Sequence, residues 1–355
     1  MTIRTIIAPT VLAAAVGATA IVLLAGGADA QDRVRWNMAS TYPGTLTQLG
    51  TLGKRIEVQI ELVSGGNIRL RFQEPGALVP ALEVFDAVST GAVEAGWSTP
   101  GYWAGRDPSL ALFSAVPFGP RSGEYLAWYY FGGGKDLFEE IYHGYNIHGV
   151  ICGIIAPEAS GWFREPIESA EDLAGLKMGF FGLGARVMEK MGVSTQLLAV
   201  TDIIPAFEQG VIDATEFSMP AIDLNLGFYQ VASHYYFPGW HQQSTMFDLM
   251  VNLDLWNGIS DGQRAQIEAV CGDSVRYGLA EGEAIQFAAL RTLQDDHGVT
   301  VHQLPPEVLD ELEAAWAEVR QELIEENENF ARVWASLSEF RENYRAWGEL
   351  GYLRR

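Results

Sequence analysis

Residues 161–217 contain the runs WFREPIESAEDLAGLKMG (Trp162–Gly179), VMEKMGV (Val187–Val193) and IPAFEQGVIDATEF (Ile204–Phe217). Short apolar segments alternate here with amphipathic ones. We therefore expect strands at Leu176–Phe181 and Thr195–Val200, with a helix at Ala185–Met191 between them. This alternation predicts an α/β fold.

The same pattern continues outward from this stretch in both directions. Upstream, strands are expected at Val34–Met38 and Ile68–Phe72, on either side of an amphipathic helix at Leu46–Leu62. The apolar runs Ile147–Ile155 and Thr245–Leu255 also predict strands. From Ser260 onward the pattern becomes helical, and it predicts long helices at Asp261–Asp296 and Glu307–Gly351.

A short sequence echo indicates two lobes of similar build. PALE at Pro80–Glu83 opens a predicted helix that ends at Gly91, and PAFE at Pro205–Glu208 opens one that ends at Gly210. A strand is expected directly after each glycine. Proline in the first turn and glycine just past the last turn are typical of helix ends.

The first 30 residues have the order of a secretory signal peptide. Arg4 precedes an uncharged apolar run from Thr5 to Gly27, and Ala28-Asp29-Ala30 forms a small-residue cleavage site. We expect residues 1–30 to be removed and the protein to be periplasmic. The alternative is an uncleaved anchor, because the run approaches the ~20 residues that span a bilayer. No cysteine follows the run, which argues against a lipid anchor.

Charge and size limit the function classes. The chain has 355 residues and a formal net charge of -22, and removal of the signal takes one basic and one acidic residue, so this charge is unchanged. Such an acidic surface argues against nucleic acid or an anionic membrane as the main partner. The remaining length exceeds one hydrophobic core, which again favours two lobes.

Cys152 and Cys271 are the only cysteines. Both lie in apolar or helical runs, HGVICGII and QIEAVCGDSV, and are expected to pack as small buried hydrophobes. A disulfide between them stays open, since sequence does not supply the geometry.

Three further runs extend the pattern to the whole chain after the signal: WNMASTYP (Trp36–Pro43), VPALEVFDAVSTGAVEAGW (Val79–Trp97) and YWAGRDP (Tyr102–Pro108). Together with the runs at 162–217, they resemble the DctP-like solute receptors of TRAP (tripartite ATP-independent periplasmic) transporters. The resemblance is greatest to the branch that binds 2-oxo and 2-hydroxy monocarboxylates together with a metal ion.

The resemblance implies a two-lobed periplasmic-binding-protein (Venus flytrap) fold with a hinge and long C-terminal helices. Lobe I would comprise residues 31–153 and about 244–290. Lobe II would comprise residues 154–243 and about 291–355. Closure about the hinge would trap the solute, and the TRAP membrane subunits would be the partner.

The resemblance also implies a set of metal ligands. In that branch an acid and the next backbone carbonyl in a TEW-like segment hold the metal, and here these are Glu216 and Phe217. Two further ligands are Glu158 in PEASGWF and Gln242 in PGWHQQ, where the family pattern has an amide first and an acid second. All supply oxygen atoms, which suit Ca²⁺ or Na⁺ better than Zn²⁺.

One departure from the family pattern concerns the ligand carboxylate. TRAP receptors have an arginine in LKxR that grips it through two parallel hydrogen bonds, whereas this chain has Gly179 after LKM. Three outcomes are open. The metal alone holds the carboxylate; Arg164 or Arg186 reaches in, helped by backbone N–H groups near Gly182 and Gly184; or a bulkier or uncharged solute fills the room beside Phe180 and Phe181.

Aromatic residues are dense in the segments that the resemblance assigns to the cleft. Those adjoining the predicted polar contacts are expected to form its wall: Tyr102, Trp103, Phe217 and Trp240.

The sequence carries no recognisable catalytic pattern, so an enzyme is not expected. His143 and His148 are five apart rather than four, and His234 and His241 have no cysteine or second carboxylate at ligand spacing. A glycosidase-like pair of acids remains a distant alternative. A sensor partner is another possibility, and the aromatic stripe of the last helices could mediate a homodimer.

Overall fold

The computed structural model describes residue 2 and residues 33–353. Apart from residue 2, the expected signal peptide lies outside the described residues. Residues from Arg33 onward form one compact unit. Among the described residues, no helix has the length and apolarity that crossing a membrane requires.

The first of two sheets has five strands in the order β2-β1-β3-β10-β4. These strands are β1 (Val34–Ser40), β2 (Ile68–Gln73), β3 (Ala95–Ser98), β4 (Ile147–Ile155) and β10 (Thr245–Asn252). β1, β2 and β3 are parallel, and β10 runs antiparallel to β3 and β4. β4 is an edge strand, yet almost all of it is buried, because α9 (Asp261–Asp295) and α4 (Gly134–Gly144) pack against it.

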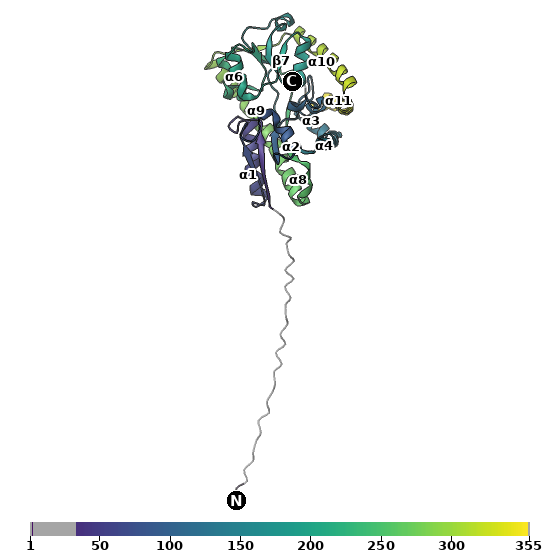
Figure 1. Ribbon diagram of the computed structural model, residues 1–355. Coiled ribbons are helices and arrows are strands. Elements are labelled where there is room, and N and C mark those ends of the chain that lie inside the picture. Colours follow the sequence, from purple (N-terminus) through teal and green to yellow (C-terminus); the bar gives the residue numbers. More distant parts are fainter. Residues whose placement is uncertain (1, 3–32, 354–355) are drawn as a thin grey trace. The chain divides into compact units, whose positions relative to one another are not determined.

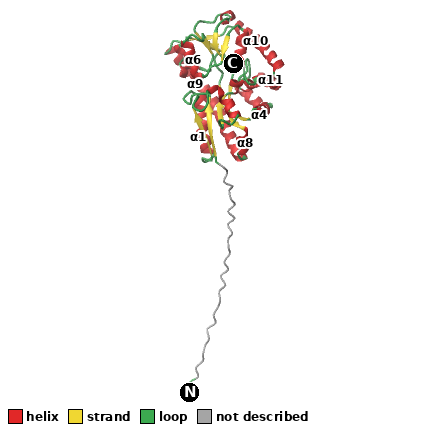
Figure 2. Cartoon of the chain, viewed as in Figure 1, coloured by secondary structure: helices red, strands yellow, loops and turns green. Residues whose placement is uncertain are grey.

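The second sheet has six strands in the order β11-β9-β5-β8-β6-β7. They are β5 (Gly161–Phe163), β6 (Lys177–Gly179), β7 (Ser194–Gln196), β8 (Ala214–Thr215), β9 (His234–Phe237) and β11 (Thr300–Gln303). Figure 2 shows the strands as two separate groups, one beside α6 (Val200–Glu208) and one beside α1 (Leu49–Val63). The strands of the first sheet come from residues 34–155 and 245–252, and those of the second from residues 161–237 and 300–303.

The remaining helices cover the sheets and join them (Figure 1). They are α2 (Val84–Ser89), α3 (Ser122–Phe131), α5 (Gly182–Lys190), α7 (Pro220–Leu226), α8 (Leu253–Gly258), α10 (Pro306–Glu326) and α11 (Glu328–Gly351). Short 3-10 helices lie at η1 (Ala81–Glu83), η2 (Pro100–Trp103), η3 (Pro108–Phe113), η4 (Ala170–Leu173) and η5 (Phe228–Gln230). α9 packs against strand β4 and against helices α1 and α7. α10 packs on α5, and α11 packs on η3.

The sequence echo is confirmed at its two glycines and at Pro80, which directly precedes η1, but not at Pro205. Gly91 and Gly210 both have a left-handed φ, of 74° and 70°, which a side chain would strain. Pro205 lies inside α6 rather than at its start. Of the strand expected at Thr195–Val200, only Thr195 and Gln196 belong to β7, and Val200 already begins α6. The proline removes one helical N–H without ending the helix.

Cys152 of β4 and Cys271 of α9 are joined by a disulfide, so the expectation that they pack as separate thiols is corrected. The bond spans 119 residues of sequence and ties the long helix to the first sheet.

Replacement of both cysteines by alanine is expected to destabilise the protein. A cross-link over a long loop lowers the entropy of the unfolded chain and so stabilises the folded state by about 2–4 kcal/mol. Thermal melting should show a midpoint several degrees lower. An unchanged midpoint would contradict the cross-link.

Asp248 of β10 is a buried acid inside the first sheet. The Tyr142 hydroxyl donates to its Oδ2 at 2.8 Å, and burial raises the pKa of Asp248 to about 7. The folded state therefore holds this proton at pH values where the unfolded chain has lost it.

The free energy of unfolding is expected to fall as pH rises from about 4 to about 7. In this range the Asp248 carboxyl binds a proton in the folded protein but not in the unfolded chain. Asp248→Asn should remove this slope. Chemical unfolding at pH 5 and pH 8 tests it: the wild type should lose more stability than the variant between the two values, and parallel losses would contradict the assignment.

Candidate functional site

The candidate site lies where three loops meet, after β4, β8 and β9. Glu158 of the first loop donates its backbone N–H to the Gln242 carbonyl of the third at 3.1 Å, and Gly239 donates to the Glu158 carbonyl at 2.9 Å. The N–H of Glu216, just after β8, donates to the Gly179 carbonyl at 2.9 Å. These backbone bonds fix residues far apart in sequence around one cavity.

The side chains of this cluster are buried and only partly hydrogen-bonded. Thr245 donates to Glu158 Oε1 at 2.9 Å and accepts from Gln242 Nε2 at 2.7 Å. The backbone N–H of Phe181 donates to Glu216 Oε2 at 3.2 Å. Four buried side-chain oxygens of residues that line the cavity have no hydrogen-bond partner among the described residues: Glu158 Oε2, Glu216 Oε1, Ser218 Oγ and Gln242 Oε1.

Two carboxyl groups thus face one cavity without a basic side chain. Burial, and then the charge of Glu216, raise the pKa of Glu158 well above its usual range. No lysine or arginine is among the described residues that line the cavity. Buried charges are normally paired or bound to a metal, so this arrangement suits a positively charged occupant.

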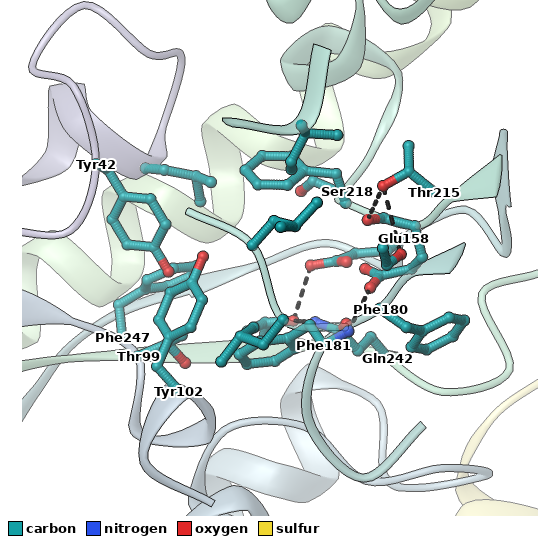
Figure 3. Close-up of a pocket in the computed structure, with 18 residues that line it drawn as sticks. Tyr42, Thr99, Tyr102, Glu158, Phe180, Phe181, Thr215, Ser218, Gln242 and Phe247 are labelled. Atoms are coloured by element: carbon teal, nitrogen blue, oxygen red, sulfur yellow. Dashed lines mark hydrogen bonds between the residues drawn. The ribbon is translucent and has the colours of Figure 1, made fainter. Parts of the chain in front are cut away.

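Tyr42 and Tyr102 line the opposite side of the same cavity, with their hydroxyl groups turned toward each other (Figure 3). Burial raises the pKa of both phenols above the ordinary value, and each is further affected by the other hydroxyl. Both remain neutral at pH 7. If the hydroxyl of one tyrosine donates to that of the other, the hydroxyl hydrogen of the accepting tyrosine is free to donate to a ligand oxygen.

Several of the residues expected at the site line this cavity. They are Glu158, Glu216, Gln242, Phe217, Gly179, Phe180 and Tyr102. A Cβ at Gly179 would lie 2.9 Å from Thr215 Oγ1, so the position beside β8 is tight rather than roomy.

Two expected wall residues lie behind the wall instead. Trp103 is buried against Phe85, with ring centroids 5.4 Å apart, and belongs to the core. Trp240 is buried against Phe180, and its carbonyl accepts from the Phe118 N–H. Both support residues that line the cavity, as large aromatics commonly do.

Neither arginine that was considered for the ligand carboxylate reaches the cavity. Arg164 bonds the carbonyls of Phe207 and Val231 and stacks on the Phe207 ring. Arg186 pairs with Glu326 on α10. The expectation for Arg164 is therefore corrected, because its guanidinium is bonded to Phe207 and Val231 and does not line the cavity.

Sequence reasoning missed two members of the cluster. His241, buried between Phe180 and Trp240, has its Nε2 3.3 Å from Glu216 Oε1. Thr245 links Glu158 to Gln242. A single histidine or threonine carries no spacing signal, although both lie within three residues of Gln242.

The donor set fits a metal ion. One ligand atom each of Glu158, Glu216 and His241 lies within 4.8 Å of the others, and all three residues are buried. Carboxylate and amide oxygens are the usual ligands of Ca²⁺ and similar hard cations. The unpartnered oxygens of Glu158, Glu216 and Gln242 would hold such an ion.

Comparison with known proteins agrees with this geometry. A model of the DctP family, bacterial extracellular solute-binding protein family 7, matches residues 39–327. The monocarboxylate 2-oxoacid-binding periplasmic protein of Nostoc sp. is 31% identical over 323 residues, covering 90% of this chain and 87% of the relative.

Two solved structures share the fold and are described with a cation and a small acid. A TRAP transporter solute-binding protein from Bordetella bronchiseptica has a TM-score of 0.87 and 33% identity over 90% of this chain and 94% of its own, with copurified calcium and picolinate in a mixed-occupancy dimer. One from Pseudoalteromonas atlantica, with bound sodium and pyruvate, has a TM-score of 0.85 and 28% identity over 89% and 96%.

These matches confirm the two-sheet periplasmic-binding-protein fold and a binding function rather than an enzymatic one. The chain belongs to the DctP family of bacterial extracellular solute-binding proteins, family 7.

Proposed function

We propose that the protein is a periplasmic receptor that binds a small 2-oxo or 2-hydroxy monocarboxylate together with a cation, and delivers it to the membrane subunits of a TRAP transporter. One observation carries the proposal. The buried, unpartnered oxygens of Glu158, Glu216 and Gln242 face a cavity lined by no lysine or arginine. The cation and acid described for the Bordetella and Pseudoalteromonas proteins support it.

Residues on one side of the cavity would bind the cation, and residues on the other side would bind the acid. Glu158, Glu216, Gln242 and the Phe217 carbonyl would hold the cation, which would supply the positive charge that an arginine at position 179 would otherwise give. On the other side, Tyr42 and Tyr102 offer a phenol proton to an oxygen of the acid. Closure of this buried site would exclude water from both sides.

Thermal melting with a small panel of solutes tests the proposal. Pyruvate and lactate, each at about 100 times Kd, are expected to stabilise the protein by about 2.7 kcal/mol, and a chelator should remove the effect until the cation is restored. Stabilisation by polyols or aromatic solutes that ignores the chelator would favour a bulkier, uncharged ligand. Native mass spectrometry of the purified protein should detect a retained acid.

The end of α11 supports a second partner, another copy of the chain. Trp347, Leu350 and Leu353 are exposed, the last two by 88% and 94%. Contiguous exposed apolar residues mark interaction surfaces, and the Bordetella relative is described as a dimer.

Light scattering on the mature protein is expected to give a dimer mass, and Trp347→Glu with Leu350→Glu to give a monomer that still binds pyruvate. A wild-type monomer at micromolar concentration would contradict the dimer.

A further inference from the structure

The binding cavity lies between two groups of elements, one around each sheet. It is lined by Tyr42 and Thr99, which follow strands of the first sheet, and by Gly179 and Thr215, which belong to strands of the second. Glu158, which also lines the cavity, is only 3% exposed. We therefore expect the two groups to move apart when a solute enters or leaves.

α11 is attached to the elements around the first sheet. It packs on η3, α3 and α4, and α4 packs on β4. Asn329 Nδ2 donates to Oδ2 of the buried Asp107 at 2.8 Å. The Arg332 guanidinium donates to both carboxylate oxygens of Glu140, at 2.9 and 2.8 Å. We therefore expect α11 to move together with the first sheet.

α10 is attached to the elements beside the second sheet instead. It packs on α5 and η4, and α5 packs on β7. Lys190 Nζ of α5 donates to Glu322 Oε1 of α10 at 2.5 Å and lies 3.7 Å from Glu318 Oε2. Figure 1 shows the same division, with α10 near β7 and α11 near α3 and α4. The two helices therefore connect the two groups of elements.

Asn327 is the single residue between α10 and α11. Its backbone is extended, with φ -137° and ψ 116°. Its side chain accepts from the Phe330 N–H at 2.7 Å and so caps the start of α11. Hinges are commonly a few residues at the ends of rigid elements. A change in the angle between the two helices would therefore occur at this residue.

Two contacts hold α10 and α11 at their present angle. The rings of Trp316 and Trp334 meet edge to face with their centroids 5.8 Å apart, and the Arg320 guanidinium lies 5.2 Å from the Trp334 ring centroid. At 1.5 Å per residue, Trp316 and Trp334 lie about 16 and 10 Å from Asn327 along their helices. A rotation at Asn327 would therefore separate the two rings.

We propose that α10 and α11 form a strap between the two halves of the receptor, which bends at Asn327 as the receptor opens and closes. The contacts of Trp334 stabilise the closed form. The inference rests on the proposed function and adds a residue outside the cavity that controls how long the acid stays bound. Loss of contacts made in the closed form shifts the equilibrium toward the open form, and so weakens binding without changing the site.

Distances between spin labels on the mature protein test the bending. Ala314→Cys on α10 and Ala335→Cys on α11 place the labels at exposed positions, while the native cysteines are joined in a disulfide. Pulsed EPR should show that this distance differs by several Å between chelator-treated protein and protein loaded with pyruvate and Ca²⁺. The control pair, Ala335→Cys with Asp136→Cys on α4, should give the same distance in both states.

Trp334→Ala tests the contacts between the helices. Pyruvate should dissociate about three- to tenfold faster than from the wild type, with a matching rise in Kd, as expected for loss of an aromatic pair and a cation–π contact. Stopped-flow displacement and calorimetric titration measure the two quantities. Trp347→Ala is the matched control, because Trp347 lies on the same helix and is 61% exposed. It should release pyruvate at the wild-type rate.

The outcomes separate the two proposals. If pyruvate and Ca²⁺ bind but the distance between positions 314 and 335 stays constant, the strap does not bend. If Trp334→Ala releases pyruvate at the wild-type rate, its contacts do not stabilise the closed form. Either result overturns the inference, while the proposed function stands. If pyruvate binds with neither Ca²⁺ nor Na⁺, both are overturned.

Discussion

Glu216→Gln is expected to weaken strongly the binding of both pyruvate and the cation. Glu216 is one of two buried carboxyl groups that line the cavity, and its Oε1 has no hydrogen-bond partner among the described residues. Removal of one partner of a buried charge pair costs about 2–5 kcal/mol, which corresponds to a loss of roughly 30-fold to several thousand-fold in affinity.

The control for this variant is Glu283→Gln, which removes the same charge from an exposed position on α9. Calorimetric titration of both variants should show wild-type affinity only in Glu283→Gln. The Glu216→Gln protein should also melt no lower than wild type without ligand, since it relieves repulsion with Glu158. Retained pyruvate binding would remove Glu216 from the site.

Gly239→Ala is expected to disrupt the same site by displacing the backbone of Glu158. A Cβ at this position would lie 2.3 Å from the carbonyl oxygen of Glu158 and 2.6 Å from its carbonyl carbon. Both are backbone atoms, so the loop that carries Glu158 must move, and the bond from the Gly239 N–H to that carbonyl is lost. We expect binding of cation and pyruvate to weaken on the order of 10- to 100-fold, as for other residues that orient metal ligands.

Gly272→Ala provides the matched substitution, because a Cβ there meets nothing within 4 Å inside α9. It should bind as the wild type does and melt at the same temperature or slightly higher, since alanine favours the helix. Full affinity in Gly239→Ala would contradict the interlocked loops, and equal losses in both variants would indicate a general effect of added methyl groups.

Much of the fold follows from local pattern. β4 has the predicted limits Ile147–Ile155, because a continuous apolar run between polar turns is a strong signal for a buried strand. α9 likewise matches the predicted long helix to within one residue. The limits of the short strands were predicted less well. A strand was expected at Thr195–Val200, but only Ser194–Gln196 is paired, and Val200 already begins α6. Sheet pairing over so few residues depends on tertiary partners.

The site was predictable only through the family resemblance. Glu158, Glu216 and Gln242 belong to three separate loops, and no local spacing connects them; the backbone bonds between the loops do so in the fold. The same limit explains the residues that were misplaced. Arg164 and Trp240 have the right chemistry for a ligand wall, but which way a side chain points from a loop is set by the packing around it.

The most direct test of the account is a crystal structure of the mature protein grown with pyruvate and a divalent cation. The account predicts an ion bonded to Glu158 and Glu216 at about 2.0–2.6 Å, near the Gln242 amide and the Phe217 carbonyl, with pyruvate between the ion and Tyr102. A pyruvate carboxylate held without any ion, or an ion bound away from both glutamates, would contradict it.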